Sequence, residues 1–197
     1  MKKGGGSQKG SGFERVIAKK LSLWWTQDLD EPRDDIFWRT SGSGARATSR
    51  TKKKKKTAYE YGDITFTDPI GKPLIDCILF ECKKGYTKEV DLLDFFFENN
   101  KKSVLFDWWR KAIEEMKEAG RKNCILIVER NRRDALVFMN WIFFVDQTVI
   151  YSGSFNQKYI ELLYSINDEK NIFIMKLSDF LNWVTPEDIK QKIEEKK

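Results

Sequence analysis

The sequence predicts an α/β fold in which a central mixed β-sheet is flanked by helices. With 197 residues, the chain is long enough for one domain with a substantial hydrophobic core. Hydrophobic residues make up 41% of it and aromatic residues 14%, which excludes a disordered protein. Apolar residues recur in the order helix, strand, strand, strand, helix, strand, strand, and this mixed order is typical of helices layered on a sheet.

The first helix is predicted to begin at Gly12. Its apolar residues recur at spacings of three and four: Phe13, Ile17, Leu21 and Trp24 or Trp25. It should end before residues 28–35, where Pro32 and clustered acids indicate a loop. Residues 1–11 are mainly Gly, Ser and Lys, and we expect a flexible basic arm.

Three strands are expected next, at Ile36–Arg39, Tyr59–Thr67 and Leu74–Lys83. The segment 41–58 combines Gly, Ser and Thr with a run of lysines, and we expect a long exposed basic loop. A loop of this length inside a compact domain is usually functional or disordered. The turn-forming residues 68–73 should join the second and third strands as a hairpin.

The remaining elements follow the same patterns. Helices are expected at Asp91–Phe97 and Ser103–Gly120, strands at Cys124–Glu129, Ala135–Val145 and Asn171–Lys176, and helices from Leu177 and Pro186. Residues 149–164 are ambiguous. We expect one core over residues 12–146, with residues 147–197 as a C-terminal extension packed on it.

The composition excludes several classes of protein. Without histidine, the chain has no Ser-His-Asp or Cys-His catalytic site and no imidazole metal ligand. Three cysteines without paired spacing (Cys77, Cys82 and Cys124) argue against a disulfide framework and a cysteine zinc site. No apolar run reaches the ~20 residues of a membrane-spanning helix, and no secretory signal is recognisable, so we expect a cytoplasmic protein.

Positive charge is concentrated near the N-terminus. Residues 1–57 hold 15 basic and 6 acidic side chains, whereas residues 58–197 carry a net charge of −3. Such clustering is typical of proteins that bind a phosphate backbone. It is most marked in a run of five lysines: Lys52, Lys53, Lys54, Lys55 and Lys56. A solvated lysine tract is an equally good interpretation of the run by itself. An anionic lipid surface is a third, but no amphipathic basic helix supports it.

Two acids and a lysine form the chemically informative pattern. Glu81 and Lys83 are two residues apart in a strand and therefore share a face. Pairing the two hairpin strands about Lys72 would place Asp63 opposite Glu81, with Cβ atoms ~4.5–5.5 Å apart. Two carboxylates this close repel unless a cation lies between them, and Mg²⁺ prefers such oxygen ligands. An ordinary strand with a salt bridge is the alternative.

Two further acids are candidates for the same cluster. Asp76 lies five residues from Glu81, an odd separation that sends it to the opposite face of the strand. Glu14 lies beside the apolar stripe of the first helix and could reach a metal site on an adjoining sheet. On spacing alone, the better interpretation of Glu14 is an acid in the first turn, favoured by the helix dipole.

Together these residues resemble the PD-(D/E)XK nuclease superfamily, and within it the archaeal-type and viral Holliday junction resolvases. The matching segments within residues 9–86 are Lys9-Gly10-Ser11-Gly12-Phe13-Glu14-Arg15, Arg39-Thr40-Ser41-Gly42-Ser43-Gly44, Gly62-Asp63-Ile64 and Glu81-Cys82-Lys83. Gly62 replaces the proline that gives the superfamily its name. The resemblance implies a restriction-endonuclease-like core and hydrolysis of DNA phosphodiester bonds by a metal-activated water.

The resemblance also implies roles for single residues. Asp63, Glu81 and the backbone carbonyl of Cys82 would bind Mg²⁺, with Mn²⁺ as a substitute. Lys83 would orient the water, and Glu14 would be an acid of the metal site. The residues that bind DNA would be Lys9, Arg15, Arg39, Ser41, Ser43, Arg46, Lys52, Lys53, Lys54, Lys55 and Lys56. Resolvases of this type are homodimers. Phe95–Phe97 or Trp108-Trp109 would be candidates for the interface, with core packing as the alternative.

Three functions remain open at this point. The first is a structure-selective endonuclease, such as a four-way junction resolvase. The second is a restriction-like or recombination nuclease that cuts ordinary duplex DNA. The third is a non-catalytic DNA-binding protein whose basic loop binds DNA and whose acids are incidental.

Overall fold

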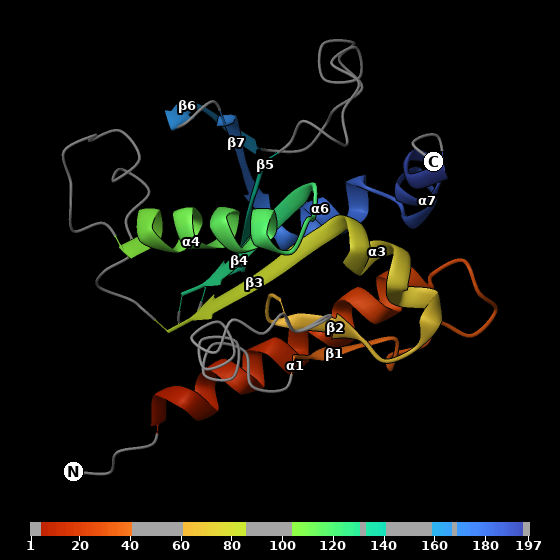
Figure 1. Ribbon diagram of the computed structural model, residues 1–197. Helices are drawn as coiled ribbons and strands as arrows, with labels where there is room; N and C mark the ends of the chain where they lie inside the picture. The colour runs from red at the N-terminus through yellow and green to blue at the C-terminus, as the bar shows by residue number, and fades with distance from the viewer. Residues whose placement is uncertain are drawn as a thin grey trace.

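The computed structural model describes residues 5–40, 61–85, 104–130, 133–140, 159–166 and 169–194 (Figure 1). The helices are α1 (Gly5–Trp25), the 3-10 helix η1 (Pro69–Gly71), α3 (Lys72–Cys77), α4 (Val104–Glu118), α6 (Leu177–Trp183) and α7 (Pro186–Glu194). The strands are β1 (Phe37–Arg39), β2 (Ile64–Phe66), β3 (Ile78–Lys84), β4 (Asn123–Glu129), β5 (Leu136–Asn140), β6 (Tyr159–Ile166) and β7 (Glu169–Lys176). The expected α/β class with a mixed sheet is confirmed.

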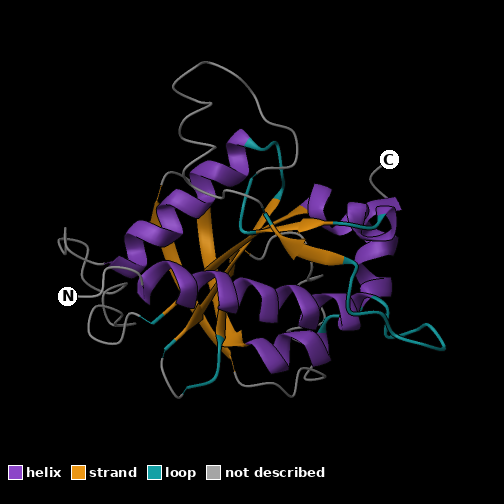
Figure 2. Cartoon of the chain, turned by 90° about the horizontal axis from the view of Figure 1, so that it is seen from below, coloured by secondary structure: helices purple, strands orange, loops and turns teal. Residues whose placement is uncertain are grey.

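Within the described residues, five strands form the main sheet in the order β3-β4-β5-β7-β6. The β3–β4 pair is parallel, and the remaining pairs are antiparallel. Helix α4 lies on one side of this sheet, and α1 with the small β1-β2 sheet lies on the other (Figure 1). Viewed from below, the strands form a layer crossed by helices (Figure 2).

Side chains of β3 alternate between two hydrophobic clusters. Ile78, Phe80 and Cys82 pack in the cluster that includes the apolar face of α1. Leu79 packs with Leu105 and other residues of α4. Because alternate residues of a strand share a face, this pattern places the odd-numbered residues of β3 on the α4 side of the sheet.

Helix α1 begins at Gly5, ahead of the expected Gly12, so part of the predicted flexible arm is helical. Its buried residues follow the expected spacing: Phe13, Ile17, Leu21, Trp24 and Trp25. Packing of the buried stripe nucleates the helix, which then extends into the preceding residues although their glycines have low helix propensity.

The predicted hairpin of residues 59–67 and 74–83 is wrong. The described part of the first segment contains the short strand β2, which pairs with β1 in antiparallel register, Ile64 opposite Arg39. In the second segment, Leu74–Cys77 belongs to helix α3, and only β3 is extended. Pro73 at the start of α3 favours the helix, and a short apolar run does not by itself distinguish a buried helix from a strand.

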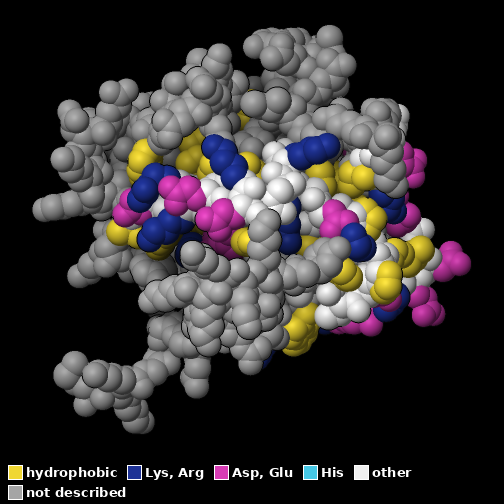
Figure 3. All heavy atoms as spheres, in the orientation of Figure 1, with side chains coloured by type: hydrophobic (Ala, Val, Ile, Leu, Met, Phe, Trp, Pro, Cys, Tyr) yellow, Lys and Arg dark blue, Asp and Glu magenta, His cyan; other side chains and the backbone are white. Residues whose placement is uncertain are grey.

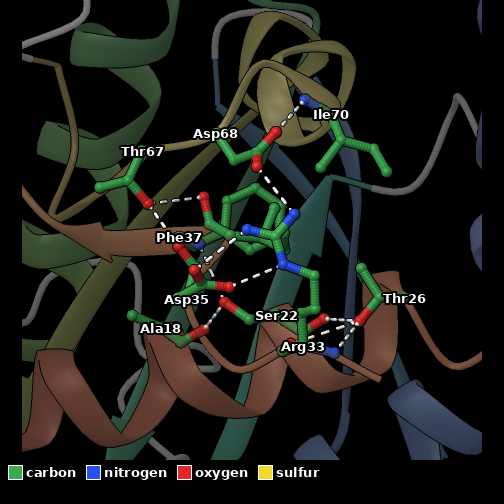
Figure 4. Close-up of polar contacts among 10 residues, drawn as sticks. Ala18, Ser22, Thr26, Arg33, Asp35, Phe37, Thr67, Asp68 and Ile70 are labelled. Atoms are coloured by element: carbon green, nitrogen blue, oxygen red, sulfur yellow. Dashed lines mark hydrogen bonds and ion pairs between the residues drawn. The ribbon is translucent and has the colours of Figure 1, made fainter. Parts of the chain in front are cut away.

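A polar network fastens the end of α1 to the chain entering β1 (Figure 4). The Ser22 hydroxyl donates to the Ala18 carbonyl at 2.8 Å and accepts the Phe37 N–H at 2.9 Å. The Thr26 hydroxyl likewise donates to the Ser22 carbonyl and accepts the Arg33 N–H, both at 2.8 Å. These bonds fix where β1 starts and hence where Arg39 lies.

Arg33 extends this network to the turn after β2 (Figure 4). Its guanidinium binds Asp35 at 3.0 Å and Asp68 at 2.8 Å. Asp68 in turn caps η1 by accepting the Ile70 N–H at 3.0 Å. The chain before β1 and the turn after β2 are therefore tied to each other and to α1.

The C-terminal segment contributes to the main sheet. Strand β7 pairs with β5 and with β6, so residues 159–166 and 169–176 extend the sheet of the core. Beyond it, the Trp24 indole N–H of α1 donates to the Val184 carbonyl at 3.0 Å. Helix α7 lies beside α3 (Figure 1).

The positions of several other expected elements are confirmed. Strands β1 and β4 and helices α4, α6 and α7 lie where they were expected. Trp109 is buried between α4 and the sheet, which favours core packing for this residue. The expected basic loop 41–58, the expected helix 91–97 and residues 141–158 lie outside the described residues. None of the helices described here is long and apolar enough to cross a membrane.

Candidate active site

Asp63 is docked against the open edge of β3, which ends the main sheet in its described part. The Asp63 N–H donates to the Phe80 carbonyl at 2.7 Å, and one Asp63 carboxylate oxygen accepts the Cys82 N–H at 2.9 Å. The Asp63 carbonyl accepts the Thr40 N–H at 2.9 Å. These three bonds hold an almost fully buried carboxylate between β1 and β3.

Gly62 makes this close approach possible. Its φ of +74° lies in the left-handed region, which costs other residues about 1–2 kcal/mol. A Cβ at this position would also lie 2.8 Å from the Phe80 carbonyl oxygen. Glycine therefore suits the position at which the superfamily's name has proline.

Asp63, Glu81 and Lys83 converge as the sequence predicted, although not through the predicted hairpin. Lys83 Nζ forms an ion pair with Glu81 and lies 3.9 Å from Asp63 Oδ2. Alternation along β3 accounts for Glu81 and Lys83, and the backbone bonds of Asp63 to the strand edge account for the third residue. Asp76, the rejected partner, is exposed on α3 and pairs with Lys72.

The pKa values of Glu81 and Lys83 are shifted from their ordinary values. Burial, together with the nearby Asp63 carboxylate, raises the pKa of Glu81 from 4.5 to about 8. Burial opposes the charge on Lys83, but the Glu81 and Asp63 carboxylates outweigh it and raise the pKa of the ammonium. Lys83 is therefore held as a cation, whereas Glu81 ionises less readily than an ordinary glutamate.

Cys82 lies under this cluster with its thiol on the α1 side. Burial raises the pKa of the thiol well above its ordinary value, as do the carboxylates of Asp63, Glu81 and Glu14. The thiol stays protonated and acts as a small buried side chain. Because the N–H and C=O of one strand residue point the same way, the Cys82 carbonyl faces the open edge beside Asp63.

Glu14 is buried on α1 and pairs with Arg39 of β1, with 2.8 Å between Arg39 Nε and Glu14 Oε2. Because α1 begins at Gly5, Glu14 lies well beyond the first turn, to which the dipole effect is confined, so the helix-dipole interpretation of Glu14 is wrong. Arg39 precedes Thr40, whose N–H binds the Asp63 carbonyl. The pair therefore adjoins the Asp63 segment.

Comparison with protein families gives a match to the model described as "Phage putative PDDEXK endonuclease", over residues 5–191. The match spans nearly the whole chain. This protein belongs to that family. Its expected restriction-endonuclease-like core follows from that membership. Searches of curated proteins and of solved structures give no match.

Two residues of this PDDEXK endonuclease that the sequence did not single out hold the chain before Asp63. Glu115 of α4 accepts the Gly62 N–H at 2.6 Å. Arg121, just after α4, donates to the Tyr61 carbonyl at 3.3 Å and to the Ile78 carbonyl at 3.4 Å. The spacing could have indicated Glu115, since it follows Trp108 by seven residues and Ala112 by three, and so continues the apolar stripe of α4.

The expected DNA-binding residues of this endonuclease are only partly described. Arg15 is exposed on α1, and Arg39 is half-buried beside Glu14. Lys9 lies in the first part of α1, where side chains are outside the description. The expected residues of the basic loop also lie outside the described ranges, so their predicted contacts with DNA stay predictions. They are Ser41, Ser43, Arg46, Lys52, Lys53, Lys54, Lys55 and Lys56.

The oxygen atoms at the β3 edge fit a hard divalent cation. No group of three Asp, Glu, His or Cys side chains able to hold a metal ion occurs among the described residues. A protein site for Mg²⁺ does not need three, because this ion is usually bound by one or two carboxylates together with waters and substrate phosphates. The Asp63 and Glu81 carboxylates with the Cys82 carbonyl supply that donor set, and a bound cation would favour the ionised form of Glu81, whose pKa is raised by burial and by the Asp63 carboxylate.

Proposed function

We propose that this PDDEXK endonuclease is an Mg²⁺-dependent deoxyribonuclease that cuts branched DNA, with the four-way junction as its preferred substrate. The observation that carries the catalytic proposal is the convergence of Asp63, Glu81 and Lys83 at the open edge of β3. A protein that only bound DNA would gain nothing from the cost of burying two carboxylates beside each other.

In this proposal, Asp63, Glu81 and the Cys82 carbonyl hold Mg²⁺, for which Mn²⁺ substitutes. The bound ion would activate water and stabilise negative charge on the phosphate. Lys83, held as a cation beside the two carboxylates, orients the attacking water and stabilises charge in the transition state. The water loses a proton as its oxygen bonds to phosphorus, one P–O bond to a sugar breaks, and the departing oxygen takes up a proton.

Glu14 and Arg39 complete the proposed site from the α1 side. Arg39 contacts a DNA phosphate near the scissile bond, and Glu14 holds its guanidinium through the 2.8 Å ion pair. Glu14 also adds negative charge near the metal ligands, as its effect on Cys82 indicates. The pair therefore links phosphate binding to the metal site.

Junction DNA is proposed from the sequence resemblance to resolvases, which covers residues 9–86. We propose that residues of the arm, of α1 and of the basic loop bind DNA phosphates: Lys9, Arg15, Ser41, Ser43, Arg46, Lys52, Lys53, Lys54, Lys55 and Lys56. We also propose a homodimer, because a two-fold assembly would place two sites on the paired strands of a junction. Sedimentation analysis of the free protein tests the dimer.

Cleavage assays with labelled four-way junction and linear duplex, in Mg²⁺ or in EDTA, test the catalytic proposal. Asp63→Asn, Glu81→Gln and Lys83→Ala should each lower cleavage by about 10²-fold or more, because each removes a group that acts on charge at the reacting phosphate. DNA binding in EDTA should be retained. Asp76→Asn is the matched control, since this acid is exposed on α3, and should cut at the wild-type rate.

The other outcomes discriminate among the alternatives. Wild-type rates in any of the three variants would refute the assigned roles. Binding of DNA without cleavage by the wild-type protein in Mg²⁺ or Mn²⁺ would favour a non-catalytic DNA-binding protein. Equal cutting of junction and duplex would favour a restriction-like or recombination nuclease.

A further inference from the structure

Glu115 reaches the candidate active site from a different side than the residues assigned to it. It lies in the last third of α4, on the face of the main sheet that Glu81 and Lys83 also occupy. Its side chain is half-buried, and its Oε1 atom accepts the Gly62 N–H at 2.6 Å. Gly62 directly precedes Asp63, so Glu115 acts on the main chain that carries this carboxylate.

The Gly62–Asp63 main chain is held from three sides. Bonds to Phe80 and Cys82 hold Asp63 on the β3 side, and the Thr40 N–H holds it on the β1 side. Glu115 holds Gly62 on the α4 side. Gly62 has φ +74°, and glycine has the greatest conformational freedom of any residue. The hydrogen bond that Gly62 donates to Glu115 therefore restrains the residue of this segment with the greatest conformational freedom.

Glu115 occupies this position at an electrostatic cost. Burial raises its pKa, the Gly62 N–H opposes that shift, and the Asp63 carboxylate raises the pKa again. An acid beside two other acids is unfavourable unless its hydrogen bond compensates. Glutamine could accept the same bond without the charge. Substitution by glutamine therefore distinguishes a role of the Glu115 hydrogen bond from a role of its negative charge.

We propose that Glu115 is a positioning residue of the nuclease site, which fixes the Gly62 main chain so that Asp63 presents its carboxylate to the metal ion. This inference rests on the proposed function. Residues that orient metal ligands typically change metal affinity or activity by about 10–100-fold when they are replaced.

Two substitutions separate the hydrogen bond from the charge. Glu115→Met keeps an unbranched stem of similar length but leaves the Gly62 N–H without its acceptor. Glu115→Gln keeps the acceptor and removes the charge. Glu118→Ala is the matched control, because Glu118 is exposed about one turn further along the same helix. Thermal unfolding of each variant verifies that it is folded.

The readouts are Mn²⁺ affinity by calorimetry without DNA, and kcat and KM for cleavage. Glu115→Met should weaken Mn²⁺ binding and lower kcat by about 10–100-fold, with KM for DNA nearly unchanged. Glu115→Gln should recover most of both, and Glu118→Ala should match the wild type. Wild-type Mn²⁺ affinity and kcat in Glu115→Met would overturn the inference, as would equal losses in Glu115→Gln and Glu115→Met.

The two proposals fail in different ways. If the wild-type protein cuts no DNA, the proposed function fails, while the Mn²⁺ titration still tests whether Glu115 positions a metal ligand. If the wild-type protein cuts DNA and Glu115→Met cuts equally well, the inference fails and the proposed function stands. Should Glu115→Met not fold, Glu115→Ala, which also removes the acceptor, takes its place. A loss of Mn²⁺ affinity of about 10-fold or more that Glu115→Gln does not share supports the inference, and wild-type affinity in Glu115→Ala overturns it.

Discussion

Single residues at the β3 edge are selected by different physical constraints. Gly62 is required by backbone geometry, because a side chain would collide with the Phe80 carbonyl. Asp63 is held by hydrogen bonds to main-chain groups, whereas Lys83 is held by ion pairs. The ionised form of Glu81 is disfavoured, because its carboxylate is buried next to that of Asp63.

The raised pKa of Glu81 predicts how the free energy of unfolding of the metal-free protein depends on pH. Because the pKa is raised in the folded state from 4.5 to about 8, the folded protein holds this proton more tightly than the unfolded chain. The stabilisation is complete below pH 4.5 and is lost as the pH rises toward about 8. The free energy of unfolding in EDTA should therefore fall over this range, as urea denaturation would measure.

Glu81→Gln is the appropriate comparison for that measurement, since glutamine has the same shape and no proton to lose. Its free energy of unfolding should vary less between pH 4.5 and about 8 than that of the wild type. An equal slope in the two proteins would mean that Glu81 titrates normally. Asp63→Asn should also reduce the slope, because the Asp63 charge contributes to the shift.

At the scale of elements, consecutive tryptophans of α1 connect parts of the chain that are far apart. The Trp24 N–H binds the Val184 carbonyl after α6, and its ring lies 6.1 Å from that of Phe180. The Trp25 N–H binds the Ile70 carbonyl of η1 at 2.8 Å, and its ring packs at an angle on Phe37 of β1. Helix α1 thus joins the C-terminal helices to the small sheet that carries Arg39.

Trp24→Phe should lower the free energy of unfolding by about 1–3 kcal/mol, because it removes a buried hydrogen bond and part of a packed ring. Urea denaturation measures the change. Trp38→Phe is the matched control, since Trp38 of β1 is 47% exposed, and should change stability by less than about 0.5 kcal/mol. Equal losses in the two variants would show that the bond between α1 and the C-terminal segment contributes nothing.

Over the whole molecule, basic and acidic side chains are unevenly distributed along the chain. On the face shown in Figure 3, Lys and Arg are intermingled with Asp and Glu among the described residues. Ion pairs occur among the described residues, as between Arg33 and the two acids Asp35 and Asp68. The excess of positive charge belongs to residues 1–57, which include the Lys52–Lys56 run. This distribution predicts that the run dominates the salt dependence of DNA binding.

Replacing Lys52, Lys53, Lys54, Lys55 and Lys56 by glutamine should weaken binding to junction and duplex alike. Each lysine that no longer neutralises a phosphate reduces the slope of log K against log salt by about 0.9, so the slope should fall by up to about 4.5. Fluorescence anisotropy in EDTA, from low to moderate salt, measures both quantities. Lys111→Gln, an exposed lysine on α4, is the control. An unchanged affinity at low salt would leave the lysine run as an aid to solubility.

The sequence by itself determined the α/β class, the buried face of α1, the shared face of Glu81 and Lys83, and the residue types that point to a nuclease. These depend on periodicity and composition, which are local properties. Only the tertiary structure decided that Leu74–Cys77 is helical, that β2 pairs with β1, and that Asp63 reaches β3 through its open edge. It also brought Glu115 to Gly62 across 53 residues. Pairing of strands and docking of helices depend on contacts between distant segments, and no local pattern specifies which of several compatible partners a segment will meet.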